Sequence, residues 1–306
     1  MKIDQAVEYF LRKCNVNHLS INTINNYKFH LRPFQEYMAK MEVCDVENIR
    51  EYHIVDYLES LSTNYAEATI RGRYVYLKIF IRSMFESEII DKDVSKNIKL
   101  PKKSKRHVYA FNRKEVETIL NSFDLSDFLG YRNYTIMSVL FATGMRKAEL
   151  LGLHIHDINF REGFMNVIGK GNKERSIPIS IRCGRILSKY IKMRNAYYAE
   201  HPCFMATDKL FITNKGKPIG VKTIDELFFD IRDSKPEWST RVSAHTFRHT
   251  FAKMFLLNGG DLFTLSKILG HEDISTTRIY LDLNITELKV QNDKYNPLDN
   301  QRWQYC

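Results

Sequence analysis

Apolar residues recur every three or four positions through the first third of the chain, which is the period of an amphipathic helix. Residues 4–13 show this spacing, with apolar side chains at Ala6, Val7, Phe10 and Leu11. Three more helices are predicted over residues 21–41, 51–61 and 66–85. Ser20 is suited to cap the second of these helices, and Pro33 is expected to kink it because proline removes a backbone donor. The first third is therefore predicted to be all-helical.

The predicted helix over residues 66–85 has an apolar side and a basic side. Its apolar side is formed by Ile70, Leu77, Ile81 and Met84. Arg71, Lys78 and Arg82 are separated by seven and four residues, so they share the opposite face. Lys28 and Arg32 have the same i, i+4 relation within residues 21–41. Such a basic stripe is typical of a solvated helix face or of a surface that contacts DNA phosphates, and both interpretations stay open here.

The remaining two thirds of the chain mix helix and strand signals. Asn112 and Glu115 have the spacing of a capping box. Helices are predicted over residues 131–142, 146–153, 181–200, 221–234, 245–257, 262–269 and 275–281. Among them, the segments 158–160, 164–169 and 175–180 are short and separated by turns, which predicts a small antiparallel sheet. The predicted fold class is therefore mainly α with a small antiparallel β-sheet.

Charge marks a boundary between these two parts. The chain has 306 residues and a net charge of +10, which favours a polyanionic partner, with nucleic acid ahead of a membrane surface. The first 100 residues contain 14 cations and 14 acids, whereas residues 101–110 add four cations and no acid. The segment 99–106 is also broken by Pro101 and lacks hydrophobic periodicity, as an exposed linker would be. The cations that would follow a phosphate backbone, or only solvate a loop, are Lys102, Lys103, Lys105 and Arg106.

These observations predict four parts of the chain. They are a helical domain over 1–98, a basic linker over 99–110, a second domain over 111–283 and a C-terminal segment over 284–306. In the last segment Asn284 and Glu287 have capping-box spacing, and Ile285 and Leu288 give the helix a small apolar side. So short a helix is marginal alone in water, so we expect its apolar side to dock on another surface, its own domain being one candidate.

The sequence argues against a membrane-spanning, secreted, disulfide-bonded, nucleotide-binding or metal-binding protein. No apolar run approaches the roughly 20 residues of a membrane span, and the first residues contain no apolar signal core, so we expect a cytoplasmic protein. The five cysteines are scattered, which argues against structural disulfides. The two glycine-rich motifs of nucleotide-binding proteins, G-x-G-x-x-G and G-x-x-x-x-G-K-[ST], are both absent from the sequence. His245 and His249 have a spacing that suits zinc, but Arg248 between them would repel a cation, so we predict no metal and no cofactor.

A set of cationic and imidazole residues next to glycine turns carries the candidate chemistry. It consists of Arg146, Lys170, His245, Arg248 and His271. Two guanidiniums, an ammonium and two imidazoles suit an anion with several oxygens, and a phosphodiester fits. A tyrosine beside such a set could act as nucleophile because cationic neighbours favour its phenolate form. Taken singly, each of these residues is also compatible with an ordinary surface or ion-paired position.

Four segments resemble the motif boxes of the tyrosine recombinase (phage integrase) family, and their style is similar to its Xer-like members. They are ATGMRKAELLGL, VIGKGNKERSIPI, SAHTFRHTFA and LGHEDISTTRIY, and they occur in the family's order. The resemblance assigns catalytic positions to Arg146, Lys170, His245, Arg248 and His271, and the nucleophile to Tyr280. Lys173 lies in the same turn as Lys170 and keeps the assignment of the general acid open. The implied fold is a helical, SAM-like core-binding domain joined to a tyrosine-recombinase catalytic domain.

The same resemblance implies a reaction and its partners. Tyr280 would attack a scissile phosphate, giving a 3′-phosphotyrosyl enzyme and a free 5′-hydroxyl, without ATP or a metal. The partners would be double-stranded DNA target sites and three further copies of the chain, in a tetramer where each C-terminal segment docks on a neighbour. Two alternatives are a type IB topoisomerase, which would relax DNA without a defined site, and a non-catalytic DNA-binding architectural protein. The sequence gives neither the target site nor the choice between chromosome-dimer resolution, integration, excision and transposition.

Overall fold

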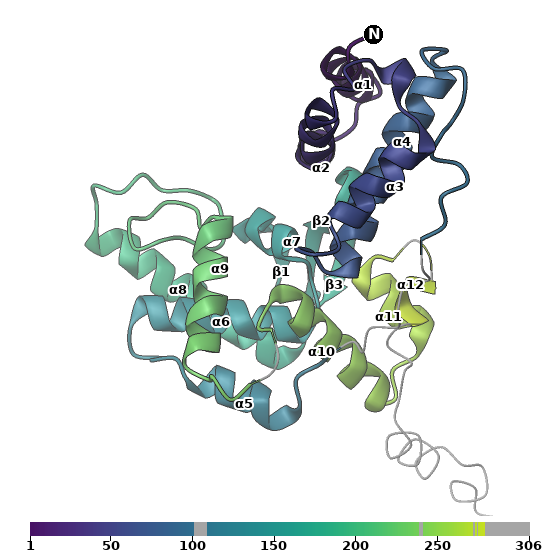
Figure 1. Ribbon diagram of the computed structural model, residues 1–306. Coiled ribbons are helices and arrows are strands. Elements are labelled where there is room, and N and C mark those ends of the chain that lie inside the picture. The colour runs from purple at the N-terminus through teal and green to yellow at the C-terminus, as the bar shows by residue number, and fades with distance from the viewer. Residues whose placement is uncertain (101–108, 239–240, 272, 274, 279–306) are drawn as a thin grey trace, which may run out of the picture. The chain divides into compact units, whose positions relative to one another are not determined.

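The chain divides into two compact units, Met1–Arg106 and His107–Cys306. Figure 1 draws the computed structural model, which describes residues 1–100, 109–238, 241–271, 273 and 275–278. The division falls inside the segment 99–110 that the sequence predicts as a linker, and the exact limits of that linker stay a prediction. Within the described residues, no helix combines the length and the apolar character that a bilayer span requires.

The first unit is a helical bundle, as the periodicity predicts. It contains α1 (Ile3–Val16), α2 (Ile21–Lys40), a 3₁₀ turn (Val46–Asn48), α3 (Glu51–Ser60) and α4 (Glu67–Glu86). The apolar faces of α1, α2 and α4 pack together around Phe10, Phe34 and Phe80, all of them buried. Ser20 caps α2 by accepting a hydrogen bond from the backbone of Thr23, and α2 runs without a break through Pro33.

The second unit is mostly helical with one small sheet. Its helices are α5 (Arg113–Asn121), α6 (Phe128–Thr143), α7 (Lys147–Gly152), α8 (Ile181–Glu200), α9 (Val221–Asp233), α10 (Ala244–Leu257), α11 (Leu262–Leu269) and α12 (Ser275–Arg278), with a 3₁₀ turn at Ile155–Asp157. The predicted capping box at the start of α5 is present, because Asn112 and Glu115 each accept a hydrogen bond from the other's backbone. Helix α6 is buried on most sides and packs against α5, α8 and α10.

The sheet has the order β1-β2-β3 and is antiparallel throughout. Its strands are β1 (Ile158–Asn159), β2 (Phe164–Ile168) and β3 (Glu174–Pro178). Met165 pairs with Ile177, and both side chains face the core together with Val167. The turn between β2 and β3 is a 3₁₀ turn (Lys170–Asn172), which holds Gly171 at a φ of +75°. The predicted fold class, mainly α with a small antiparallel sheet, is therefore confirmed.

Candidate active site

A glycine turn between α6 and α7 sets the position of Arg146. Gly144 ends α6 with a φ of +61°, and a Cβ atom there would lie 2.5 Å from Cδ1 of Phe251. Glycine is thus required both for the left-handed backbone and for the close approach of α10. Two residues later Arg146 is the N-cap residue of α7, and about a third of its side chain, 33%, is exposed. Its guanidinium is therefore positioned at the surface by a rigid turn.

Glu149 lies beneath Arg146 and receives four hydrogen bonds. Its Oε2 accepts from the backbone N–H of Arg146 at 2.7 Å, and its Oε1 accepts from Nη1 of the same arginine at 2.9 Å. Arg175 of β3 donates Nη1 to Oε1 at 2.6 Å and Nη2 to Oε2 at 2.9 Å, which is a bidentate pair. The carboxylate is 2% exposed. Sequence reasoning missed Glu149 and Arg175, although the i, i+3 spacing of Arg146 and Glu149 could have indicated the first contact.

Three successive carbonyl groups at the end of α11 hold three arginines. Arg175 Nε donates to the Ile268 carbonyl at 3.0 Å, and Arg248 Nη2 donates to the Leu269 carbonyl at 2.7 Å. Arg146 Nη2 lies 3.5 Å from the Gly270 carbonyl. The C-terminus of a helix carries partial negative charge on such carbonyls, so it favours guanidiniums at this place.

Arg248 of α10 is the most deeply placed of the predicted site residues. It is 5% exposed, and its Nη1 donates to the Gly144 carbonyl at 2.9 Å. Its Nη2 also lies 2.7 Å from Nε2 of His271. An arginine can only donate, so Nε2 accepts, and Nδ1 of His271 carries the proton that it shares with Oγ1 of Thr277 at 2.7 Å. Buried Thr277 thus orients the imidazole from α12.

Burial and, after it, the neighbouring cations favour the neutral form of His271 and His245. Burial, followed by the charges of Arg248, Arg146 and Arg175, lowers the pKa of His271 to about 4. The pKa of His245 is also lowered, by desolvation first and then by Arg248 and Arg146.

The pKa of Glu149 is lowered, although its burial acts in the opposite direction. Burial alone would raise that pKa, but the hydrogen bonds from Arg175 and from the Arg146 backbone outweigh it. Ionised Glu149 with Arg146, Arg175 and Arg248 leaves an excess of positive charge at the end of α11. This arrangement suits an anion with several oxygens.

Comparison with known proteins identifies the family. The model of the phage integrase family matches residues 110–287, and the model of the phage integrase N-terminal SAM-like domain matches residues 7–84. The chain is 31% identical over 297 residues to tyrosine recombinase XerD of Staphylococcus haemolyticus, which covers 96% of this chain and 99% of the relative. It is 32% identical over 285 residues to tyrosine recombinase XerD of Halalkalibacterium halodurans, covering 91% and 93%.

The chain belongs to the phage integrase family. It is a tyrosine-type site-specific recombinase of the Xer-like kind. Solved structures agree on the fold. The XerH site-specific recombinase in a post-cleavage complex with difH substrate has a TM-score of 0.73 at 22% identity, covering 94% of this chain and 83% of that one. The Tn1549 transposon integrase in complex with transposon right end DNA also has a TM-score of 0.73, at 17% identity, covering 96% and 99%.

The structure brings together four of the six predicted catalytic residues of this recombinase. Arg146, Arg248 and His271 meet at the end of α11, and His245, whose side chain is exposed, lies one turn before Arg248 on α10. Tyr280 lies outside the described residues, and so does the side chain of Lys170.

The backbone of the hairpin that carries Lys170 does reach the site. A Cβ atom at Gly169 would lie 3.4 Å from Nη1 of Arg175 and 3.5 Å from Oε1 of Glu149.

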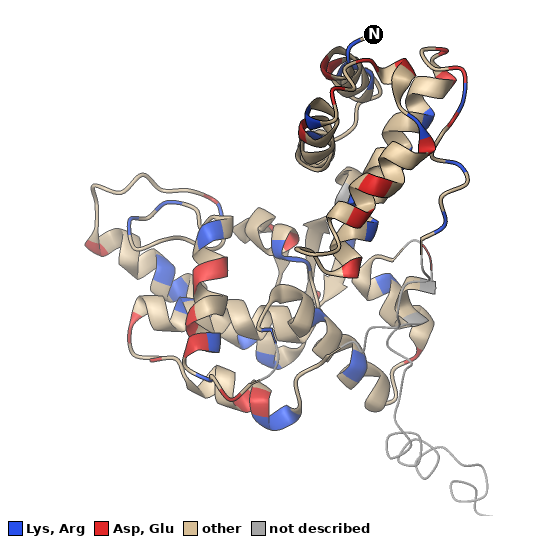
Figure 2. Cartoon of the chain, viewed as in Figure 1, with Lys and Arg blue, Asp and Glu red and all other residues tan. Residues whose placement is uncertain are grey.

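The predicted DNA-binding residues of the first unit differ from one another in their exposure to solvent. Lys28 and Arg32 on α2 and Arg82 on α4 are exposed, whereas Arg71 and Lys78 on α4 are partly buried. Arg32 forms an ion pair with Glu36 at 2.9 Å and Arg82 with Glu86 at 2.8 Å. Figure 2 shows acidic and basic segments interspersed over this unit, in keeping with its balanced count of charges. The linker cations Lys102, Lys103, Lys105 and Arg106 lie outside the described residues.

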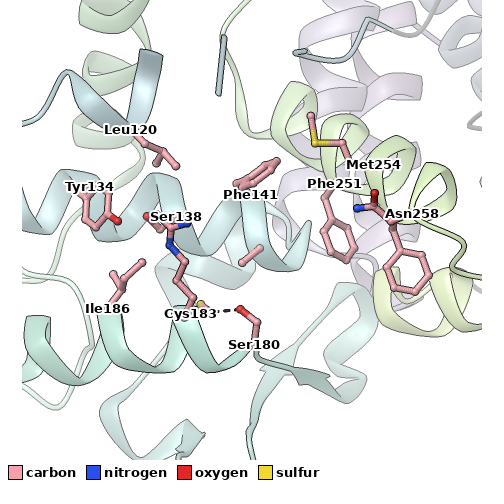
Figure 3. A pocket seen from close by; sticks show the side chains of 13 residues that line it. Leu120, Tyr134, Ser138, Phe141, Ser180, Cys183, Ile186, Phe251, Met254 and Asn258 are labelled. Atoms are coloured by element: carbon pink, nitrogen blue, oxygen red, sulfur yellow. Dashed lines mark hydrogen bonds between the residues drawn. The ribbon is translucent and has the colours of Figure 1, made fainter. Parts of the chain in front are cut away.

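Two other features of the second unit are separate from this site. His154, His156 and Asp157, in and next to the 3₁₀ turn after α7, offer potential metal ligands within 4.8 Å of one another, and His156 is exposed. An apolar cavity of about 320 Å³ lies between α6, α8 and α10 (Figure 3). Phe141 and Phe251 line it, and it contains none of the predicted catalytic residues.

Proposed function

We propose that this recombinase cleaves and rejoins DNA strands by transesterification at the end of α11. The phenolic oxygen of Tyr280 attacks the scissile phosphorus, and the bond from phosphorus to the 5′ oxygen breaks. The products are a 3′-phosphotyrosyl enzyme and a 5′-hydroxyl that has taken up one proton. The phosphotyrosyl bond replaces the phosphodiester bond, so the reverse attack by another strand's 5′-hydroxyl rejoins DNA without ATP.

The main support for this proposal is that Arg146 and Arg248 both contact the last carbonyl groups of α11. The two guanidiniums come from different helices, and each is fixed by hydrogen bonds to backbone or to Glu149. Donors fixed in advance stabilise the extra negative charge of a pentacovalent transition state without reorganising. We therefore assign both arginines to the non-bridging oxygens of the scissile phosphate.

His271 would hydrogen-bond one of those oxygens. Its Nε2 accepts from Arg248 in the described arrangement, so donation to phosphate requires the proton to move to Nε2. Thr277 can follow this change because a hydroxyl donates as readily as it accepts. Oγ1 of Thr277 then donates to Nδ1 of His271 at the same position.

Two residues would move protons. His245 has a lowered pKa, so it is neutral near pH 7 and can accept the proton of the attacking Tyr280 hydroxyl. Lys170, or Lys173 in the same hairpin turn, would protonate the 5′ oxygen as it leaves. The hairpin backbone lies next to the Glu149–Arg175 pair, since a Cβ atom at Gly169 would be in ordinary contact with both side chains, and this supports the assignment to the hairpin.

The remaining expectations concern binding and assembly. Cations of α2, α4 and the linker would contact phosphates of the duplex. Four copies would assemble on two cytoplasmic DNA sites, with residues 284–306 of each docked on a neighbour. We expect deletion after Leu283 to preserve binding to a half-site while reducing synapsis and strand exchange. Normal synapsis by this truncation would exclude docking between copies, and loss of folding would favour docking within one copy.

Covalent trapping tests the proposed reaction. The protein is incubated with sheared genomic DNA of its host, denatured, and the DNA that remains attached is sequenced. Mass spectrometry of the digested adduct should find the 3′-phosphate on Tyr280, and the reads should converge on defined sites. An adduct on another residue would overturn the assignment of the nucleophile. Relaxation of supercoiled DNA with adducts at dispersed positions would favour a topoisomerase instead.

A further inference from the structure

Arg175 has a place in the site that no predicted catalytic role covers. The geometry assigns it as a positioning residue, which locks the Glu149 carboxylate to the end of α11 and so sets the spacing of Arg146 and Arg248. This inference rests on the proposed function, because the arginines it positions are those assigned to the scissile phosphate.

The contacts of Arg175 explain why it acts through other residues. Its Nη1 and Nη2 donate to the two oxygens of Glu149, and its Nε donates to the Ile268 carbonyl. Every guanidinium nitrogen thus has a protein acceptor, and its side chain is 15% exposed. Arg146 shares Glu149 with it but is 33% exposed. Arg175 therefore supports the site from beneath, while Arg146 faces outward.

The backbone around Arg175 is shaped to admit its side chain. Gly270 ends α11 with a φ of +64°, and a Cβ atom there would lie 2.9 Å from Cδ of Arg175. On the other side, a Cβ atom at Gly169 would lie 3.4 Å from Nη1 of Arg175, an ordinary contact. Gly270 therefore leaves room for the arginine at the end of α11, and the hairpin lies beside its guanidinium. The side chain connects β3, α7 and α11 at one point.

Lysine would not reproduce this connection. The Arg175 guanidinium presents three nitrogens in one plane, two toward a carboxylate and one toward a carbonyl on the other side. An ammonium group is a single point charge on a flexible stem, and it cannot span both acceptors in a fixed geometry. We therefore expect Arg175→Lys to keep the charge of the site and lose the alignment of Arg146.

Loss of Arg175 also gives a specific pH signature. Burial raises the pKa of Glu149, and Arg175 and Arg146 are the charged groups that oppose this effect. Without Arg175 the pKa of Glu149 rises, so the carboxyl takes up a proton at a higher pH and releases Arg146. Cleavage would then fall as the pH decreases, in a range where the wild type is still active. His271 and His245 also titrate near this site, but both are present in every variant compared.

The test uses single-turnover cleavage at the target site found by covalent trapping, with half-site affinity measured in parallel. We expect Arg175→Lys and Arg175→Gln to slow cleavage about 100-fold with affinity within about threefold, an effect like loss of one preorganised donor. Ser176→Ala is the matched control, because Ser176 is exposed on the same strand and its Oγ donates to Oδ1 of Asn166 across the hairpin. It should cleave at the wild-type rate.

The double variant Arg175→Gln/Glu149→Gln separates positioning from folding. It buries no unpaired carboxylate, so it should fold, yet at about pH 5.5 it should cleave as slowly as Arg175→Gln, because in both variants Arg146 then lacks an ionised anchor. Between about pH 8 and pH 5.5 the rate of Arg175→Gln should fall about tenfold more than that of the wild type, and the double variant should lack this extra fall.

Near-wild-type cleavage by Arg175→Lys, or the same pH profile in all variants, would overturn the inference. A wild-type protein that forms no adduct would instead reject the proposed function.

Discussion

Two arginines of the first unit and two of the second are held in opposite ways. In the first unit, Arg32 and Arg82 are exposed, and each is paired with a glutamate one turn later on its own helix. In the second unit, Arg248 and Arg175 are bound to carbonyl groups or carboxylates from other elements, and Arg248 is 5% exposed. The first arrangement leaves long side chains exposed to solvent, where a phosphate backbone could reach them. The second fixes them before any ligand arrives.

This difference separates affinity from rate. Exposed cations gain binding energy mainly by releasing counterions, which needs charge but little geometry. A transition state, in contrast, is stabilised by donors that already point at the developing charge. The first unit should therefore govern how tightly the duplex is held, and the end of α11 how fast it is cut. Each prediction below tests one side of this division.

Tyr280→Phe should give the largest effect, complete loss of cleavage with unchanged half-site affinity. In the proposed reaction only the phenolic oxygen forms the covalent bond, while both sets of cations remain in the variant. Adduct formation is followed on a nicked substrate whose cleaved fragment diffuses away. Cleavage by this variant would mean that another residue is the nucleophile.

Lys170→Ala should slow cleavage of an ordinary phosphodiester by about 100-fold or more, since general acids contribute rate factors of that order. A 5′-bridging phosphorothiolate should be cut at nearly the wild-type rate, because sulfur leaves without a proton. Lys173→Ala is the matched comparison in the same turn. Equal losses on both substrates would place Lys170 among the cations that only bind.

Stability of the second unit should fall in mild acid. Burial is the largest cause that lowers the pKa values of His249 and His271 to about 4, below the ordinary value of 6.5. The unfolded chain therefore binds more protons between these limits, and stability is lost as the pH falls from about 6.5 toward 4. Melting temperatures across this range should decrease less in His271→Asn than in the control His18→Asn, which changes an exposed histidine of the first unit. Equal decreases would contradict the assignment.

Replacing the linker cations Lys102, Lys103, Lys105 and Arg106 by glutamine should have the smallest effect on chemistry. Affinity should decrease at all sequences, and the log–log salt slope should become shallower by up to about 3.6, at about 0.9 per contact. The saturated cleavage rate should not change. An unaltered slope would show that these cations only solvate a loop.

Much of this organisation follows from local sequence patterns. Helix periodicity, the caps at Ser20 and Asn112, and the hairpin all depend on residues close in the sequence, and the structure confirms them. The ion pairs of Arg32 and Arg82 could have been predicted from the glutamates four residues on.

The support of the site could not be predicted in this way. Arg175 meets Glu149 across 26 positions and Ile268 across 93, and no periodicity encodes such contacts. Arg175 and Glu149 both lie inside the motif boxes, but nothing in the sequence of those boxes indicates that the two side chains contact each other. Nor does the sequence indicate that Arg248 is almost completely buried, or that it donates hydrogen bonds to carbonyl groups at the ends of both α6 and α11.

The central claim is that fixed guanidiniums set the rate and exposed cations set the affinity. The most direct measurement compares Arg248→Lys with the double variant Arg32→Gln/Arg82→Gln, recording half-site affinity and the single-turnover cleavage rate at saturating protein for both. Arg248→Lys should cut at least about 100-fold more slowly with affinity within about threefold. The double variant should bind more weakly, with a shallower salt dependence, and cut at the wild-type rate once saturated. If Arg248→Lys loses only affinity, or the double variant loses only rate, the claim is contradicted.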